Sequence, residues 1–398
     1  MLKSKIKSLA SAALPEIITI RRHIHAHPEL SFEEVNTSKY ISSKLKEYGI
    51  PYKDKVVKTG IVATIEGKNP GRKTIALRAD MDALPIKEEN KAEYASKNIG
   101  VMHACGHDVH TSSLLGTAKI LSQLRNDFEG TIKLIFQPGE EKLPGGASLM
   151  IKEGVLENPK PASIYAQHVF PSMETGKVGF KSGMYMASTD ELYVTVKGKG
   201  GHAAMPDTYV NPILIASTIL LNLQDLFMGE KKKVGAPTVL AFGKIVANGA
   251  TNVVPGEVKI EGTFRTMNEQ WRKEAHGILK KIAQDIARKM GGICEFTVMN
   301  GYPVLVNDEK VTAKAKKYAE DFLGKENVED LDMRMTAEDF AFYTHHVPAC
   351  FYRLGTGNKA KNITSNIHTS TFDIDEKALE TGAGLMAWIA VCELSTNY

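Results

Sequence analysis

Cysteine is scarce in this sequence. Among 398 residues there are only Cys105, Cys294, Cys350 and Cys392, and no two of them form a CxxC pair. A chain of this length can bury a large core without the disulfides that small secreted domains need. We therefore expect a reducing compartment, the cytoplasm, and a chemical role for at least one cysteine.

Long apolar runs are also absent. No segment reaches the roughly 20 apolar residues needed to cross a bilayer. The N-terminal segment MLKSKIKSLASAALPEIITI contains lysines but no uninterrupted apolar stretch of signal-peptide length. The pattern argues against a membrane partner and against export.

There is little excess charge of either sign. The sequence has 50 Lys and Arg against 46 Asp and Glu, and its longest basic run, Lys231–Lys233, is interpreted as a solvated loop. Nucleic-acid binding therefore has little electrostatic support. With 43% hydrophobic and 24% charged residues, the composition is that of a globular protein. The length predicts two or three domains.

Helix and strand patterns alternate in the first half of the chain. Helices are expected near residues 4–25, 31–49, 109–124 and 147–154, with Glu33 and Glu34 in the first turn of the second. Short runs rich in Ile, Val and aromatic residues predict strands at 60–67, 74–80, 131–138 and 162–170. This alternation predicts an α/β fold whose mainly parallel sheet is flanked by helices.

The pattern changes after about residue 181. Strands expected at 190–200, 237–248, 257–267 and 293–302 and helices at 211–227 and 268–292 follow the order βαββαβ. That order is typical of a small ferredoxin-like α+β domain. We expect residues 186–301 to form an inserted lid and dimerisation domain. Residues 1–185 and 302–398 would form one discontinuous catalytic domain, completed by a helix near 309–322, a strand at 349–355 and a helix near 376–394.

The segment MHACGHDVH, residues 102–110, concentrates side chains that bind metals. It contains three histidines, Cys105 and Asp108, and a glycine separates Cys105 from His107. Thiolate and imidazole are good ligands for Zn²⁺ and similar ions. Taken alone, the segment fits either a metal site or a Cys–His nucleophile pair.

Other acidic and histidine residues stand where predicted strands end. Asp80 ends one strand and Asp82 follows it, Glu140 and Glu141 follow a second, and His168 ends a third. Ligands bind at the carboxyl ends of parallel strands. A cysteine hydrolase does not need these residues, whereas a metal centre does. One carboxylate can bind metal while its neighbour acts as general base.

With these motifs the chain resembles a known family, the di-metal amidohydrolases. These include aminoacylases, hippurate hydrolases, N-acetyl-diaminopimelate deacetylases and plant auxin-conjugate hydrolases, within the zinc aminoacylase–carboxypeptidase superfamily. The resembling stretches, in order, are RRHIHAHPELSFEE, RADMDALPI, MHACGHDVHT, QPGEE, YAQHVFP, GKGGHAAMP, TNVVPG, GTFRT, AEDFAFY and IHTSTFDIDE. The match is to the subgroup with a cysteine at the metal site.

The resemblance implies roles for particular residues. The implied ligands of two divalent ions (Zn, Mn, Co or Ni) are Cys105, His107, Glu141, His168 and His368. Glu140 matches the general base, and Asp80 an acidic residue that orients the centre. Residues that hold the substrate's carbonyl and carboxylate match His202, Asn252 and Arg265 on the insert. A substrate-facing loop is expected at Gly355, Thr356 and Gly357.

The expected activity is metal-dependent hydrolysis of the amide bond of a small N-acyl amino acid. A dipeptidase or carboxypeptidase on the same site, a catalytically silent small-molecule binding protein, and a cysteine-nucleophile hydrolase are the alternatives. The family resemblance also implies a homodimer through the insert, in which His202 reaches into the partner's active site.

Overall fold

The computed structural model describes residues 1–226 and 236–395, so the expected loop at Lys231–Lys233 lies outside the described residues. The chain divides into two compact units. The first comprises Met1–Tyr185, Val306–Asp332 and Asp339–Tyr398, and the second comprises Met186–Leu305 and Met333–Glu338. The chain passes from one unit to the other through β7 (Gly183–Met186) and β14 (Leu305–Asn307). No helix in the described part of the chain is long and apolar enough to cross a membrane.

The boundary between the units differs from the expected one. The first unit resumes at Val306 rather than at residue 302, and the segment Met333–Glu338 belongs to the second unit. Val304 packs against Ala187 and Met267, both in the second unit. The strand pattern indicated where regular structure ends, but it carried no information about these contacts.

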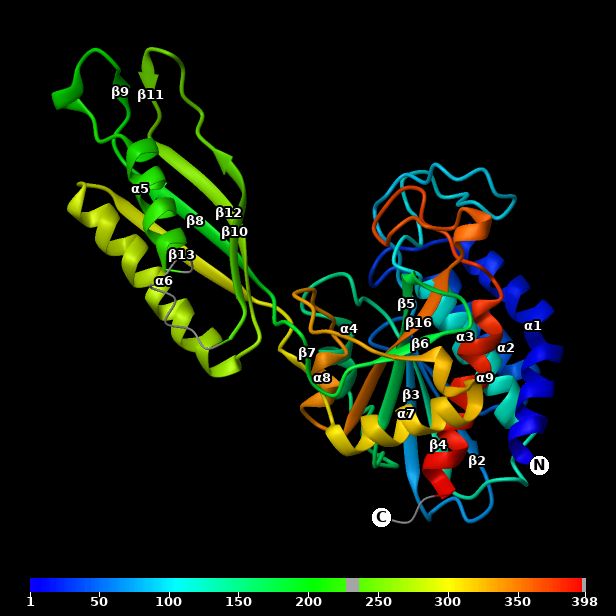
Figure 1. Ribbon diagram of the computed structural model, residues 1–398. Helices are drawn as coiled ribbons and strands as arrows, with labels where there is room; N and C mark the ends of the chain where they lie inside the picture. The colour runs from blue at the N-terminus through cyan, green and yellow to red at the C-terminus, as the bar shows by residue number, and fades with distance from the viewer. Residues whose placement is uncertain (227–235, 396–398) are drawn as a thin grey trace. The chain divides into compact units, whose positions relative to one another are not determined.

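An eight-stranded sheet forms the centre of the first unit (Figure 1). Its strands, in spatial order, are β1 (Tyr52–Val56), β2 (Gly60–Glu66), β4 (Thr131–Gln137), β3 (Thr74–Asp80), β5 (Ile164–Glu174), β16 (Ala349–Gly357), β6 (Val178–Phe180) and β15 (Val328–Asp330). The central strands β4, β3, β5 and β16 are parallel to one another. The pairings β1–β2, β2–β4 and β16–β6 are antiparallel. The expected mainly parallel sheet is confirmed in its centre.

Helices α1 (Leu2–Ala26), α3 (His107–Ser122) and α9 (Ala378–Ser395) pack against one another beside this sheet. Almost every residue of α3 is buried, because helices and strands surround it. Gly116 permits this close packing, since a Cβ there would meet the side chains of Ile17 and Ala383. Further helices of the unit are α2 (Val35–Glu47), α4 (Gly146–Lys152), α7 (Glu309–Leu323) and α8 (Ala341–Thr344).

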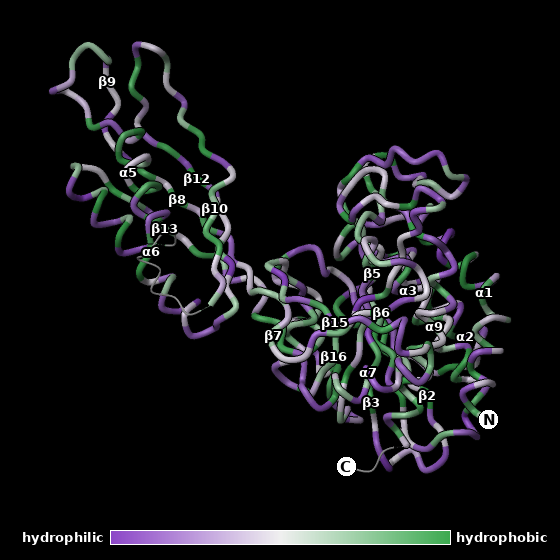
Figure 2. The backbone as a smooth tube through the Cα atoms, viewed as in Figure 1, coloured by the Kyte–Doolittle hydropathy of each residue, from purple (hydrophilic) through white to green (hydrophobic). Residues whose placement is uncertain are grey.

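The described residues of the second unit form a four-stranded antiparallel sheet with two α-helices, and a short two-stranded pair of β9 (Gly201–His202) with β11 (Val253–Val254). The strands of the four-stranded sheet and the two α-helices follow the order βαββαβ: β8 (Asp190–Lys197), α5 (Pro212–Asp225), β10 (Thr238–Val246), β12 (Glu257–Thr266), α6 (Glu269–Lys289) and β13 (Ile293–Asn300). The spatial order is β10-β12-β8-β13. Residues of β8 alternate between buried and partly exposed, as expected when one face of a sheet is covered. Hydrophobic and hydrophilic residues also alternate along α6 in Figure 2, which matches its single buried face.

Candidate metal centre

Cys105 and His107 are presented together by the start of α3. Between them, Gly106 adopts a left-handed conformation with φ of 81°, and the helix begins at His107. A Cβ at Gly106 would lie 2.6 Å from Cγ2 of Val169. Both the backbone angle and the lack of space therefore require glycine here. The tight turn directs both side chains toward the carboxyl ends of the central strands.

The structure brings the five expected metal ligands together. Cys105 Sγ lies 3.5 Å from His168 Nε2 and 3.3 Å from His368 Nε2. Glu141 Oε1 lies 3.4 Å from His368 Nε2 and 3.9 Å from His107 Nε2. Two sets of three donors result, Cys105–His107–His168 and Cys105–Glu141–His368, and the donor atoms of each set lie within 4.8 Å of one another. Cys105 is common to both sets.

Two of the histidines are oriented by backbone hydrogen bonds. His168 donates from Nδ1 to the carbonyl of Val169 at 2.9 Å, so that its Nε2 lone pair faces Cys105. The backbone N–H of His368 donates to the carbonyl of Ala104 at 2.7 Å, which places its ring beside Cys105. Burial, with the charge of Arg353, holds the pKa of His168 well below its usual value. His168 is therefore neutral, as a metal ligand must be.

Asp82 holds three parts of the site at once. Its carboxylate accepts hydrogen bonds from Nδ1 of His107 at 3.2 Å and from the backbone N–H groups of Glu140 and Glu141 at 3.1 and 3.0 Å. With Nδ1 engaged in this way, Nε2 of His107 faces the other donors, and carboxylate partners of this kind tune metal-bound histidines. The sequence placed Asp82 at the correct sheet edge but indicated no role for it.

Asp80 is held by neighbours of the site, although its carboxylate also forms a compact donor set with His107 and His110. Its Oδ1 accepts from His110 Nδ1 at 2.6 Å, its Oδ2 accepts from Arg78 at 2.6 Å, and Oδ2 is 3.8 Å from Nε2 of His107. Burial alone would raise the pKa of Asp80, but the charges of His107 and Arg78 hold it well below its usual value. The Asp80 carboxylate is therefore ionised beside His107.

Glu140 lies next to the donors that it is expected to serve. The Glu140 carboxylate, the Glu141 carboxylate and the His107 ring form another compact set of donor atoms. Oε1 of Glu140 accepts a hydrogen bond from the backbone N–H of Asp339 at 3.3 Å. The adjacent glutamates thus share one loop, and both of their carboxylates reach the centre.

The chemistry of the site fits a metal ion. In the described part of the chain, Nε2 of His107 is buried without a hydrogen-bond partner. Burial disfavours a charged imidazole, but Asp80 and Asp82 outweigh it and raise the pKa of His107 to about 10. Burial, reinforced by the negative Glu141, raises the pKa of the Cys105 thiol well above its usual value. Without a cation, this pocket retains protons that a divalent ion would displace.

The expected substrate residues of the second unit fall into two places. His202 lies on β9 (Gly201–His202), which pairs with β11 (Val253–Val254), and Asn252 directly precedes β11. Nδ1 of His202 accepts from the N–H of Ala204 at 3.1 Å, so its exposed Nε2 carries the proton and can donate. Arg265 lies eight residues along β12 from Glu257, which is about 26 Å at strand rise. Since β9 and β11 lie together at the end of the unit where β12 begins, His202 and Arg265 are at opposite ends of this sheet (Figure 1).

The expected loop at Gly355, Thr356 and Gly357 is wrong. These residues form the buried end of β16. A Cβ on Gly355 or Gly357 would overlap a backbone carbonyl of β5, at Glu174 or Pro171 respectively. The glycines are explained by this close approach of two strands, which a loop-like GTG sequence does not indicate.

Comparison with known proteins agrees with this geometry. Residues 76–390 match the family model described as peptidase family M20/M25/M40. The chain belongs to this family. An N-acyl-L-amino acid amidohydrolase of Geobacillus stearothermophilus is 43% identical over 310 residues, which is 78% of this chain and 83% of the relative. A thermostable carboxypeptidase 2 of Saccharolobus solfataricus is 35% identical over 98% of both chains.

A solved M20 structure extends the comparison. It is the Bacillus subtilis YXEP protein, described as a dinuclear metal-binding peptidase of the M20 family. It is 34% identical, with a TM-score of 0.83 over 97% of this chain and 99% of that chain. The resemblance inferred from the motifs is therefore confirmed at the level of family and fold.

Proposed function

We propose that this M20 protein is a metal-dependent amidohydrolase that cleaves the amide bond of N-acyl amino acids. The observation that carries the proposal is the convergence of Cys105, His107, Glu141, His168 and His368, with Glu140 beside them. The name of the Geobacillus relative supports the substrate class. All four cysteines are free thiols, which suits a reducing compartment such as the cytoplasm.

We infer two divalent ions per chain. Two donor sets share Cys105, and the YXEP structure is described as dinuclear. Mixed thiolate, imidazole and carboxylate donors admit Zn²⁺, Mn²⁺, Co²⁺ or Ni²⁺. Activity of the metal-free protein after addition of each ion separately will identify the effective metal.

The residues divide the reaction between them. Bound divalent ions would supply Lewis-acid polarisation and a lowered pKa for water. Glu140 takes the proton of the attacking water and returns it to the leaving nitrogen. The imidazole Nε2–H of His202 donates to the developing oxyanion. The Arg265 guanidinium, of which one N–H donates to the carbonyl of Met335, offers its other donors to the substrate carboxylate.

The direct test is Glu140→Gln. We expect both metals to remain and kcat to fall about 100- to 10,000-fold, the usual contribution of a general base. Metal content by mass spectrometry and turnover of N-acetyl and N-benzoyl amino acids are the measurements. A variant that loses metal but turns over normally after re-metallation contradicts the role of Glu140.

A carboxypeptidase or dipeptidase is the second candidate, because a 35% identical relative is named a carboxypeptidase. Unblocked dipeptides in the same substrate panel separate this activity from N-acyl hydrolysis. Loss of activity with chelators, and its return on re-metallation, excludes a cysteine-nucleophile mechanism. Binding without hydrolysis of any panel member, in metal-loaded protein, would favour a silent binding protein.

We also propose a homodimer through the second unit. The edge strand β10 exposes Ile245 and Val246, and α5 exposes Leu214 and Leu221, two turns apart on one face. Edge strands and apolar stripes of this kind are suited to pairing with a second copy. Pairing also accounts for the separation of His202 from Arg265, since each site can take His202 from the partner.

Complementation tests this arrangement. His202→Ala and Glu140→Gln chains, each nearly inactive alone, are mixed under conditions of subunit exchange. A mixed dimer then has one site with both defects and one with neither, so about a quarter of normal activity should return with random exchange and independent sites. No recovery despite demonstrated exchange places His202 outside the partner's site.

A further inference from the structure

The segment Ser31–Glu34 has no role in the mechanism above, although it lies against the loops that do. Glu34 precedes α2 and its side chain is fully buried. Its Oε1 accepts hydrogen bonds from the backbone N–H groups of Gly139 at 2.8 Å and Phe32 at 2.9 Å. Its Oε2 accepts from the hydroxyl of Thr59 at 2.7 Å. Gly139 is the residue immediately before Glu140.

Phe32, in the same segment, also packs its ring closely against Gly139. Gly139 and Phe32 are both left-handed, with φ of 64° and 66°. A Cβ on Gly139 would overlap the Phe32 ring. The hydroxyl of Ser31 donates to Oδ2 of Asp82 at 2.6 Å. The segment therefore contacts both groups that fix the backbone of Glu140: Gly139, which precedes it, and Asp82, which accepts its N–H.

We propose that Glu34 is a positioning residue for the reaction, which holds Gly139 so that the Glu140 carboxylate keeps its place beside the metal ligands. The proposal rests on the proposed function, in which Glu140 is the base. Two N–H donors and one O–H donor converge on the two oxygens of Glu34. Only a carboxylate accepts from all of them without presenting a donor of its own.

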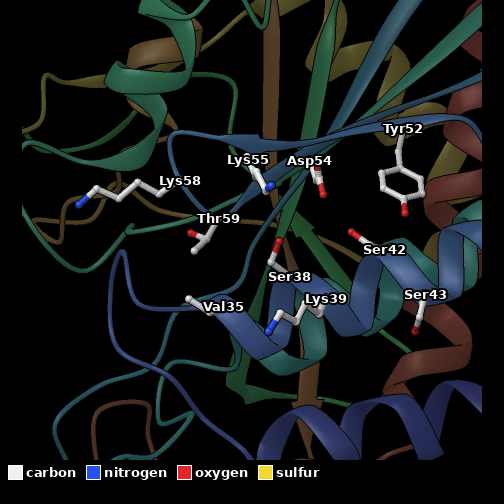
Figure 3. Close-up of a pocket in the computed structure, with 10 residues that line it drawn as sticks. All are labelled: Val35, Ser38, Lys39, Ser42, Ser43, Tyr52, Asp54, Lys55, Lys58 and Thr59. Atoms are coloured by element: carbon white, nitrogen blue, oxygen red, sulfur yellow. The ribbon is translucent and has the colours of Figure 1, made fainter.

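The unfavourable burial of the Glu34 carboxylate supports a role in positioning rather than in stability. Burial, with the negative charge of Asp82 nearby, raises the pKa of Glu34 to about 7. A buried carboxylate whose ionised form is disfavoured is a poor choice for stability alone. Thr59, which donates to Glu34, also faces the surface. There it lines a pocket of about 340 Å³ together with Val35 and Ser38 of α2 (Figure 3). Glu34 thus spans from the wall of that pocket to the loop of Glu140.

Steady-state kinetics provide the first test, with Glu33 as the matched control. Glu33 is the exposed neighbour of Glu34 in the same segment. In metal-loaded Glu34→Ala we expect kcat to fall about 10- to 100-fold, the usual effect of losing an outer-shell partner, with KM changed less than about threefold. Glu34→Gln should fall between this variant and the native protein, and Glu33→Ala should match the native protein.

Amide hydrogen exchange of the metal-free protein provides a readout independent of turnover. The Gly139 amide should exchange at least about tenfold faster in Glu34→Ala, because its acceptor is lost, and should be unchanged in Glu33→Ala. Unchanged protection at Gly139 together with unchanged kcat overturns the proposal. If Glu34→Ala does not fold, Thr59→Val and the isosteric Glu34→Gln carry the same two measurements. Normal turnover by Glu140→Gln would instead refute the proposed function, whatever Glu34 does.

Discussion

Gly139→Ala tests whether the contact between the Phe32 ring and the Glu140 loop is as tight as the structure shows. The chain offers a matched control in Gly49, because φ is 63° at Gly49 and 64° at Gly139. An added Cβ has open space around it at Gly49 but overlaps the Phe32 ring at Gly139. The left-handed backbone costs alanine about 1–2 kcal/mol at either position. Overpacking should add about 1–3 kcal/mol at Gly139 alone.

Urea unfolding of the metal-free protein measures this difference without the contribution of metal binding. Both glycines lie in the first unit, and Trp388 of α9 stacks on Phe322 there. A Trp271→Phe background removes the tryptophan of the second unit, so that fluorescence follows the first unit. We expect Gly139→Ala to be less stable than Gly49→Ala by about 1–3 kcal/mol. In a Phe32→Ala background this excess should disappear. Equal losses in the two alanine variants would refute the reasoning.

Three further outcomes follow from the site. Asp82→Asn should weaken metal binding about 10- to 100-fold, because Nδ1 of His107 loses its carboxylate partner, and competition with a chelator of known affinity measures the change. Metal binding at pH 7 should release protons from both Cys105 and His107, because their pKa values lie above this pH in the metal-free protein. The heat of binding measured by calorimetry should therefore change with the ionisation enthalpy of the buffer that takes up these protons. Because the pKa of His107 is raised in the folded state, its protonation stabilises the metal-free fold fully below pH 6.5, and this stabilisation is lost as the pH rises toward about 10. Thermal unfolding of the metal-free protein at several pH values measures the loss. The His107→Gln variant is the control and should lack it.

The sheet and the convergence of its ligands were predictable because both follow from short-range pattern. The runs at 74–80 and 131–138 have strand length and composition, and both are fully buried strands of the central sheet. Since parallel strands end at one edge, Asp80 and Glu141 had to lie near one another. The expectation that His168 also ends its strand is wrong, because β5 continues to Glu174, but the parallel pairing of Arg78 with Ala166 still sets His168 level with Asp80. The start of α3 added Cys105 and His107 to the same edge.

The residues that support the ligands were not predictable in the same way. The sequence predicts Glu34 in the first turn of a helix, but it lies just before α2 and its side chain turns inward to Gly139, 105 positions away in sequence. Asp82 contacts His107 at the start of α3 and two consecutive backbone amides in the loop after β4, segments that are 25 and 58–59 positions away in sequence. Such roles depend on tertiary hydrogen bonds, for which the sequence contains no periodic signal. The prediction of a loop at Gly355 is wrong for the same reason, because the carbonyl that requires a glycine there belongs to Glu174 on another strand.

The three histidines of residues 102–110 show why spacing alone does not identify a ligand. His107 and His110 lie one turn apart on α3, with ring centroids 5.4 Å apart. In His110, Nε2 accepts from the N–H of Val169 and Nδ1 donates to Asp80, so neither nitrogen is left for a metal. In His107, only Nδ1 is engaged, and Nε2 faces Cys105 and Glu141. His103 is buried and uncharged, because burial lowers its pKa to about 4. Between His107 and His110, what distinguishes the ligand is thus whether the protein's own hydrogen bonds leave one ring nitrogen free. A free nitrogen is not sufficient, because both ring nitrogens of His103 lack a partner among the described residues, yet His103 belongs to none of the donor sets found there. The free nitrogen must also face the other donors, and Asp82 arranges this for His107 by accepting from its Nδ1.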